Sequence, residues 1–157
     1  MSNDGGTMAK VEEFIVDTLA ALEYNGVKVF KTADHWDGQI GQEDSGKESF
    51  ERYTPFAFVK GFHNDPDFEG DRDLKQSFRF AVCVGQSAKT SKLSRIGDDK
   101  NLGVSMLHDL VIDAINGKHP GSGIQTECLF FDGASEVVDG KNKYAEELQF
   151  KADYIKE

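Results

Sequence analysis

The segment Ser77–Gln86 reads SFRFAVCVGQ, and its pattern predicts a strand at the centre of a sheet. Its large apolar residues occupy alternate positions, namely Phe78, Phe80, Val82 and Val84. Alternate residues of a strand point to the same face, so one face here is wholly apolar and the other is mixed. Such a strand fits the middle of an antiparallel sheet that lies beneath a helix.

Two segments outside this strand have the spacing of helices. Apolar residues recur at steps of three and four in Met8–Tyr24 and again in Gly103–Asn116. Thr7 is a candidate cap for the first helix, and Asn25-Gly26 supplies an exit from it. A short extended piece, Val27–Lys31, follows that exit.

Further extended segments complete the predicted sheet. They are Pro55–Phe62, Ile124–Phe131, Ser135–Val138 and Tyr144–Ile155. Asp132-Gly133 is a hairpin-type turn signal between two of them. Together these elements predict an α+β fold with a mixed, mostly antiparallel sheet, two main helices packed on one face, and long loops.

Length and charge restrict the class of protein. The 157 residues predict a single domain over the whole chain, with residues 1–7 expected to be flexible. The net charge is −10, from 28 acidic and 18 basic residues. A nucleic-acid grip needs clustered Lys and Arg to displace counterions, so this charge argues against one.

The cysteines and the N-terminus predict the compartment. Cys83 and Cys128 both lie in apolar segments, so we expect reduced core thiols rather than a disulfide framework. No apolar run approaches the roughly 18 residues that a membrane span needs. The polar start of the chain does not resemble a signal peptide, so the protein is expected to be intracellular when made.

Two groups of residues were considered as metal sites. Asp65–Asp73 resembles the start of a calcium-binding loop, but its twelfth position is Gln76 rather than a bidentate Glu. His35, Asp37 and His63 could supply zinc or iron ligands, but no pair of His residues has ligand spacing on one element. We therefore predict no metal and no cofactor.

Catalytic signatures are also missing from the sequence. There is no GxSxG motif, and neither cysteine has a histidine near it in the chain. His108 lies among apolar residues and is interpreted as a packed or edge residue. The chain is therefore predicted not to be an enzyme.

The long polar loops are the candidate interaction sites. Thr32–Tyr53 and His63–Asp73 are both predicted to be loops, and loops of this length usually serve a partner. Some of their aromatic residues are expected to fold onto the core and others to anchor a partner. Lys89–Arg95 is a short basic run in an acidic protein. The predicted interface residues are His35, Trp36, Phe50, Phe68, Lys89, Lys92 and Arg95.

The order of these motifs resembles a known group of proteins. After the first helix come PFAFVKGF at residues 55–62 and FRFAVCVGQSAKT at residues 78–90. The step Arg95–Gly97 and the helix GVSMLHDLVIDAING follow, and the chain closes with FFDGASEVV and YAEELQFKADY. In this order the chain resembles the phage minor tail proteins of the Mu Gp37-like group, and more broadly the tail terminators of long-tailed phages.

The resemblance implies a structural protein of the virion tail, assembled in the host cytoplasm. Six copies would form a ring on the last layer of tail tube protein, stop polymerisation, and present a joining surface to the head-neck connector. Tail sheath protein is a further implied partner, and DNA would pass through the lumen without specific binding. An acidic chain could give a lumen that repels phosphate.

Two other classes stay open from the residues alone. One is a calcium- or zinc-binding module or small enzyme that uses the acidic and His-containing loops. The other is an adaptor that binds a different protein through loop aromatics without ring symmetry. Elemental analysis would separate the first from a tail protein, and a stable one-to-one complex would favour the second.

Overall fold

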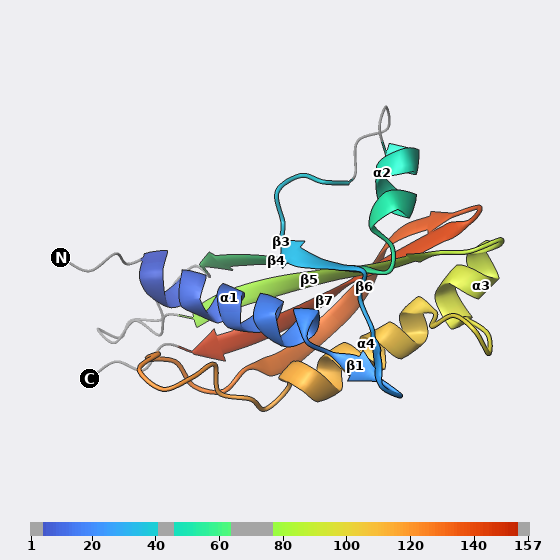
Figure 1. The fold of residues 1–157 in the computed structure, drawn as a ribbon. Helices are drawn as coiled ribbons and strands as arrows, with labels where there is room; N and C mark the ends of the chain where they lie inside the picture. The colour runs from blue at the N-terminus through green and yellow to red at the C-terminus, as the bar shows by residue number, and fades with distance from the viewer. Residues whose placement is uncertain (1–4, 41–45, 64–76, 154–157) are drawn as a thin grey trace.

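The computed structural model describes residues 5–40, 46–63 and 77–153. Its main sheet has five strands in the order β3-β4-β5-β7-β6. Their bounds are β3 Thr32–His35, β4 Phe56–His63, β5 Ser77–Ser87, β6 Phe130–Gly140 and β7 Lys143–Asp153. β3 runs parallel to β4 and the other pairs are antiparallel, which confirms the predicted mixed, mostly antiparallel α+β fold (Figure 1).

Helices α1 (Gly5–Ala20) and α4 (Val104–Ile115) cover one face of this sheet (Figure 1). Each helix has an apolar stripe with steps of three and four, so one side packs inward while the other meets solvent. The fully buried stripe residues are Val11, Ile15 and Leu19 in α1, and Leu107, Val111 and Ile115 in α4. We call this the helix face of the sheet.

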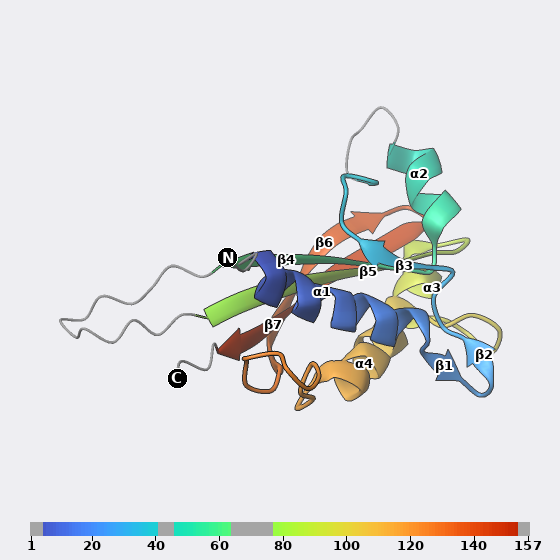
Figure 2. The ribbon, with the colours of Figure 1, turned by 60° about the vertical axis from the view of Figure 1, so that its left-hand side comes forward.

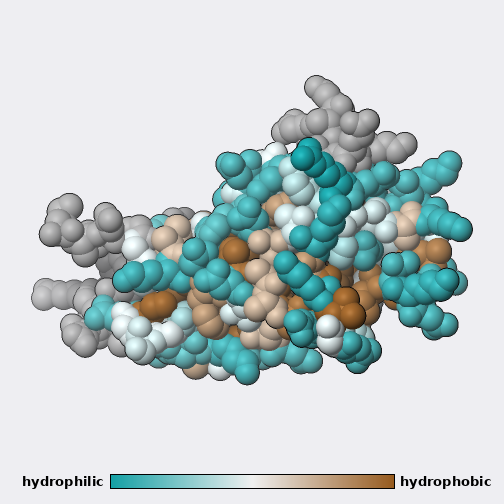
Figure 3. Space-filling model, in the orientation of Figure 1, coloured by the Kyte–Doolittle hydropathy of each residue, from teal (hydrophilic) through white to brown (hydrophobic). Residues whose placement is uncertain are grey.

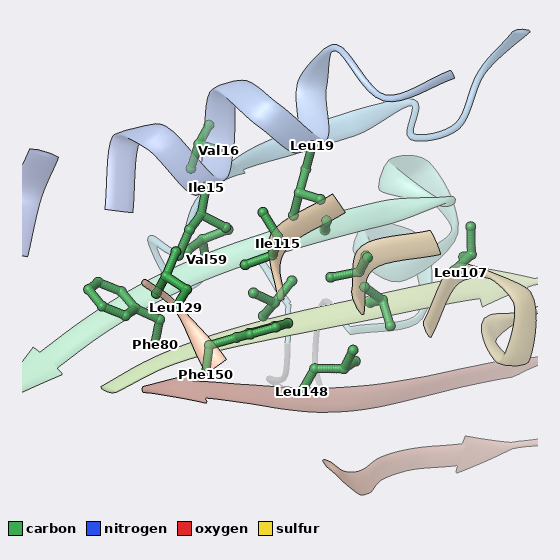
Figure 4. Packing of buried hydrophobic residues seen from close by; sticks show 14 of the residues in the cluster. Ile15, Val16, Leu19, Val59, Phe80, Leu107, Ile115, Leu129, Leu148 and Phe150 are labelled. Atoms are coloured by element: carbon green, nitrogen blue, oxygen red, sulfur yellow. The ribbon is translucent and has the colours of Figure 1, made fainter. Parts of the chain in front are cut away.

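β5 is the central strand, as its alternation predicts. Val82 lies opposite Val59 of β4 on one side and opposite Leu148 of β7 on the other. All three side chains are fully buried in the cluster beneath α1 and α4. Figure 4 shows Phe80 and Phe150 in the same layer, below Ile15 and Leu19. This layer is the hydrophobic core.

Within the described residues, helix α2 (Gly46–Tyr53) and the segment after β3 cover part of the opposite face of the sheet. Figure 2 shows α2 on the far side of the sheet from α1 and α4. Phe50 packs edge-on against Phe56, with ring centroids 5.1 Å apart. We call this the open face.

The prediction of a loop over residues 32–53 was therefore wrong in two places. β3 forms at its start because Thr32–His35 pairs with Phe56–Val59. α2 forms at its end because Phe50 gains a buried position there. Both elements depend on contact with β4, and the local sequence carries no sign of that partner.

Two turn predictions also need correction. Asn25-Gly26 does not simply end the first helix but forms the turn between β1 (Glu23–Tyr24) and β2 (Val27–Lys28). Both turn residues have positive φ, 54° and 78°, as a tight hairpin turn requires. Figure 2 shows this hairpin projecting beyond the end of α1. α1 begins at Gly5, so Thr7 lies inside the helix rather than at its cap.

Asp132-Gly133 is not a hairpin turn either. It lies within β6, where the register shifts between Phe131 and Ala134. The chain reverses instead between Gly140 and Lys143, which lie opposite each other at the end of the β6–β7 pair. A bulge can take up an extra residue without ending the strand. Asp132-Gly133 therefore lies at a bulge within β6, although the dipeptide is also typical of a hairpin turn.

The basic run is helical rather than a loop. Helix α3 spans Ser91–Ile96, and the Thr90 side chain accepts a hydrogen bond from the Leu93 amide at its start. Ser94 is fully buried on the inner side. The helix thus presents its cations outward on a fixed support.

Some predictions concern residues outside the described part of the chain. These include Phe68 and the acidic segment Asp65–Asp73, which was compared with a calcium-binding loop.

Both cysteines are free, in agreement with the expected reduced thiols. None of the described helices has the length and apolar character to cross a membrane.

Candidate interaction surfaces

An apolar groove of about 340 Å³ lies on the open face beside α2. We call it the sheet groove. Its lining residues are Trp36, Ile40, Phe58, Lys60, Ala81, Cys83, Val137, Val138 and Glu147. They come from four strands and the segment that follows β3. No single element could build this surface.

Trp36 is held in place at one side of the sheet groove. Its backbone amide donates to the carbonyl of Val59 (2.8 Å), which extends the β3–β4 pairing by one residue. Its ring packs edge-on against Phe58, with centroids 6.0 Å apart. Gln39 then donates to the His35 carbonyl (2.8 Å) and accepts from the Asp37 amide (2.6 Å), which braces the segment. Trp36 is therefore half-buried on a fixed backbone.

Cys83 lies on the floor of the sheet groove. It is opposite Phe58 on β4 and opposite Glu147 on β7. Burial raises the pKa of the Cys83 thiol to about 12, and the nearby Glu147 carboxylate adds to the effect. Because the thiolate is the nucleophile, the raised pKa lowers the reactivity of this cysteine at neutral pH.

β6 forms the rim of the sheet groove and one edge of the sheet. Val137 and Phe130 are large apolar residues in this strand, and they are 49% and 56% exposed. The strand also contains Asp132, Glu136 and Asp139 and no Lys or Arg. Arg79 pairs with Asp132 at 2.5 Å. The edge is therefore acidic, with exposed apolar residues at two points.

A second surface lies on α3 and the residue before its cap. Residues 89–96, here called the basic segment, read KTSKLSRI and contain three cations and no acid. Lys89, Lys92 and Arg95 are all exposed, and Ile96 beside them is 52% exposed. Figure 3 shows hydrophilic side chains crowded at the end of the molecule where α3 lies.

The basic segment lies on the helix face, opposite the sheet groove. Arg95 lines a cavity of about 340 Å³ together with His108 of α4 and Glu146 of β7. Glu146 lies opposite Val84, whose side chain belongs to the core beneath α1 and α4. The two surfaces are therefore on different sides of the sheet.

The cavity near Arg95 contains a histidine paired with a carboxylate. The Nδ1 atom of His108 is paired with the carboxylate of Glu146. Burial raises the pKa of Tyr144, and a hydrogen bond to Glu136 raises it further. The His108 ring also packs edge-on against Phe131, with centroids 5.7 Å apart. His108 thus joins α4 to β6 and β7, in line with its interpretation as a packed residue.

His35 occupies a different position from the one expected of an exposed anchor. Its Nδ1 lies 2.5 Å from Glu12 and its Nε2 lies 2.9 Å from Glu13, both in α1. Both ring nitrogens are therefore committed within the chain. The raised pKa of His35 comes first from the Glu12 hydrogen bond, with Glu13 adding to it and burial opposing it.

The seven predicted interface residues thus separate into distinct places. Lys89, Lys92 and Arg95 lie together in the basic segment, and Trp36 lines the sheet groove. Phe50 is only 2% exposed and is a core residue of the open face, so its prediction as an exposed anchor needs correction. The structure does not describe the position of Phe68.

Sequence reasoning missed Val137, Val138, Ile96 and Glu147. Val137 and Val138 follow each other in the chain, and a second register shift occurs between Glu136 and Val138. A strict alternation would have put one of them on each face, but both line the sheet groove. The only sequence signal was an adjacent pair of β-branched residues in a polar segment.

Within the described residues, no three or more His, Cys, Asp or Glu side chains are grouped so as to hold a metal ion. Neither a family model nor a curated protein matches this chain.

Proposed function

We propose that this protein is a structural protein of a phage tail, a tail terminator. In this proposal six copies form a ring that caps the tail tube, stops its polymerisation, and offers a joining surface to the head-neck connector. The proposal treats the protein as a structural part of the virion and not as an enzyme.

The observation that carries the proposal is the apolar sheet groove with Val137 exposed on its rim. Exposed apolar surface costs roughly 25 cal/mol for each Å² left in water, so contiguous apolar patches usually mark contacts with another protein. The groove is built on four strands of the sheet, which suits contact with a folded partner. Tail tube protein, tail sheath protein and further copies of this chain are the partners proposed.

The charge of the chain supports the same proposal. A net charge of −10 gives a ring of six copies a strongly acidic character. If this acidic character extends to the lumen of the ring, the lumen would repel DNA phosphate and let the genome pass without specific binding. A map of charge on the assembled ring tests this point, and a strongly basic lumen would contradict it.

The alternative of a metal-binding module or small enzyme has less support among the described residues. His35 is one of its ligand candidates, and both ring nitrogens of His35 already bond to carboxylates of α1. A metal ion would have to displace Glu12 and Glu13 from both nitrogens. Elemental analysis of the purified protein, with a thermal shift on added calcium or zinc, tests this alternative.

Removal of the gene from its phage is the direct test of the tail-terminator proposal. Without the protein, we expect electron microscopy to show tails of uncontrolled length that fail to join heads. The wild-type gene supplied in trans should restore uniform tails, and Val137→Asp should not. Val27→Asp is the matched control, because Val27 is an exposed valine in the β1–β2 hairpin, away from the sheet groove. Normal tails without the gene would refute the proposal.

A further inference from the structure

We infer that neighbouring copies of this chain contact each other by seating the basic segment of one copy in the sheet groove of the next. The inference rests on the proposed function, because it names the partner of the groove within the ring. The partner is a second copy, and the argument depends on apolar fit, charge and the placement of the two surfaces.

The basic segment presents an apolar residue at a fixed point. Ile96 is the last residue of α3, and Gly97 ends the helix with φ 84°. The Gly97 amide bonds to the carbonyl of Leu93 (2.8 Å), and Asp98 bonds to Asn101 just beyond (3.0 Å). The tip is thus ordered before it meets a partner, which lowers the entropy lost on association. A single exposed isoleucine on a rigid tip suits an apolar groove.

The charges of the two surfaces are complementary. Lys92 and Arg95 precede Ile96 in the basic segment, while Glu147 lines the sheet groove near the acidic strand β6. Lys60 also lines the groove, but on β4, which β5 and β7 separate from β6. The cations are therefore expected at the β6 side, near Glu147. Opposite charges at the rim of a contact favour the correct orientation and faster association.

The placement of the surfaces sets the symmetry of the contact. The basic segment is on the helix face and the sheet groove is on the open face. A two-fold contact would bring identical patches together, whereas this contact joins two different patches. Each copy then has one free groove and one free basic segment, so the contact repeats head to tail. Such a series closes into a ring when the rotation between copies allows it.

One contact within the chain already relates the two surfaces. The hydroxyl of Ser91, at the start of α3, donates to Asp139 of β6 (2.6 Å). This bond fixes the basic segment relative to the edge strand in each copy. The angle between the basic segment and the sheet groove is therefore the same in every copy, as a closed ring requires.

Thiol crosslinking between two single-cysteine variants of the full chain tests the contact. Ile96→Cys and Val137→Cys are each made in a Cys83→Ala/Cys128→Ser background, because both native cysteines are free and Cys83 lines the sheet groove, so each variant carries one thiol. The two proteins are mixed and treated with a short bismaleimide. We expect crosslinked dimers from the mixture and little from either protein alone. Circular dichroism checks that both variants are folded.

A chain with both changes, Ile96→Cys and Val137→Cys, should give a ladder of products that ends at the ring. The matched control pairs Ile96→Cys with Val27→Cys, which is more exposed than position 137 (68% against 49%) but lies on the β1–β2 hairpin, and it should give no ladder. Strong crosslinking of Val137→Cys with itself would overturn the inference, because it would indicate a two-fold contact. The absence of any crosslink would also overturn it, while the tail-length experiment would still decide the proposed function.

Discussion

His35 of β3 and Glu12 of α1 are joined by a hydrogen bond of 2.5 Å between Nδ1 and a carboxylate oxygen. The second ring nitrogen of His35 lies 2.9 Å from Glu13. An ionised carboxylate only accepts hydrogen bonds, so two such partners favour the doubly protonated imidazolium form of the ring and raise the pKa of His35. The other oxygen of Glu12 accepts from the Gly61 amide of β4 (2.6 Å). The contacts of Glu12 with His35 and Gly61 therefore hold α1 against β3 and β4 at one edge of the sheet.

The first prediction is that this contact makes stability depend on pH. The pKa of His35 is raised in the folded protein, so its contribution is full below the unfolded value of 6.5 and is lost as pH rises through the raised value. His35→Gln should lower the free energy of unfolding by about 0.5–1 kcal/mol at pH 6 and by less at pH 9. The estimate is small because the His35 side chain is 40% exposed. Denaturant unfolding at several pH values measures it.

Glu12→Gln is the matched control for the pH prediction. The amide oxygen of Gln can still accept from the Gly61 amide, but the side chain carries no charge. The variant should lose most of the same pH-dependent part of stability as His35→Gln. A pH profile for both variants that parallels the wild type would contradict the role given to this pair.

The second prediction compares two valines in different surroundings. Val82 is fully buried at the centre of β5, and Val137 is 49% exposed on β6. Val82→Ala removes buried methyl groups and leaves a cavity, so we expect a loss of about 2 kcal/mol in the free energy of unfolding. Val137→Ala should change that free energy by less than about 0.5 kcal/mol. Equal losses at both sites would contradict the described core.

The third prediction concerns a close approach of backbone at Gly103. Its φ of −84° is open to any residue, so conformation alone does not require glycine here. An added Cβ would lie 2.3 Å from the carbonyl carbon of Ile96 and 2.4 Å from the amide of Gly97. Gly103→Ala should therefore destabilise the protein by about 1–3 kcal/mol through displacement of α3 from α4. Ser105→Ala, on the exposed side of α4, is the control, and thermal unfolding compares the two.

The fourth prediction concerns assembly rather than folding. Reversal of charge by Lys92→Glu with Arg95→Glu should weaken association of copies by roughly tenfold or more, because like charges would then meet at the groove rim. The free energy of unfolding should change little, since both side chains are exposed. Analytical ultracentrifugation over a range of protein concentrations measures the first effect and denaturant unfolding the second.

Lys31→Glu with Lys118→Glu is the control for this charge reversal. It changes the net charge by the same amount at exposed positions outside the basic segment. If the two double variants associate equally well, the basic segment has no special part in assembly. Unchanged incorporation of Lys92→Glu/Arg95→Glu into tails would lead to the same conclusion.

The main helices and the central strand were predictable because their signals are local. Leu107, Val111 and Ile115 are spaced to share one side of a helix, and Phe78, Phe80 and Val82 alternate as a strand requires. Gly103 and Asn116 mark the ends of α4 as expected. α2 carries a weaker signal, because its one buried aromatic, Phe50, gains its position only through Phe56 of β4.

The candidate surfaces were predictable only in part. The basic segment is continuous in the chain, so Lys89, Lys92 and Arg95 could be grouped before the structure was known. The sheet groove could not, because Trp36, Cys83 and Val137 come from separate segments. Phe50 was predicted as an interface residue but is buried, and the cause is again a contact between separate segments. An aromatic residue in a polar segment is equally consistent with a buried and an exposed position until its neighbour is known.

The amino-acid sequence by itself determined where the chain forms its main helices and its central strand, since periodicity acts within a segment. It also determined the acidic charge and the position of the one basic run. Only the tertiary structure decided that β7 lies between β5 and β6, that His35 meets Glu12 at a separation of 23 residues, and that the groove faces away from the basic segment. Those relationships depend on which faces of distant segments exclude water together, and no single segment specifies its partner.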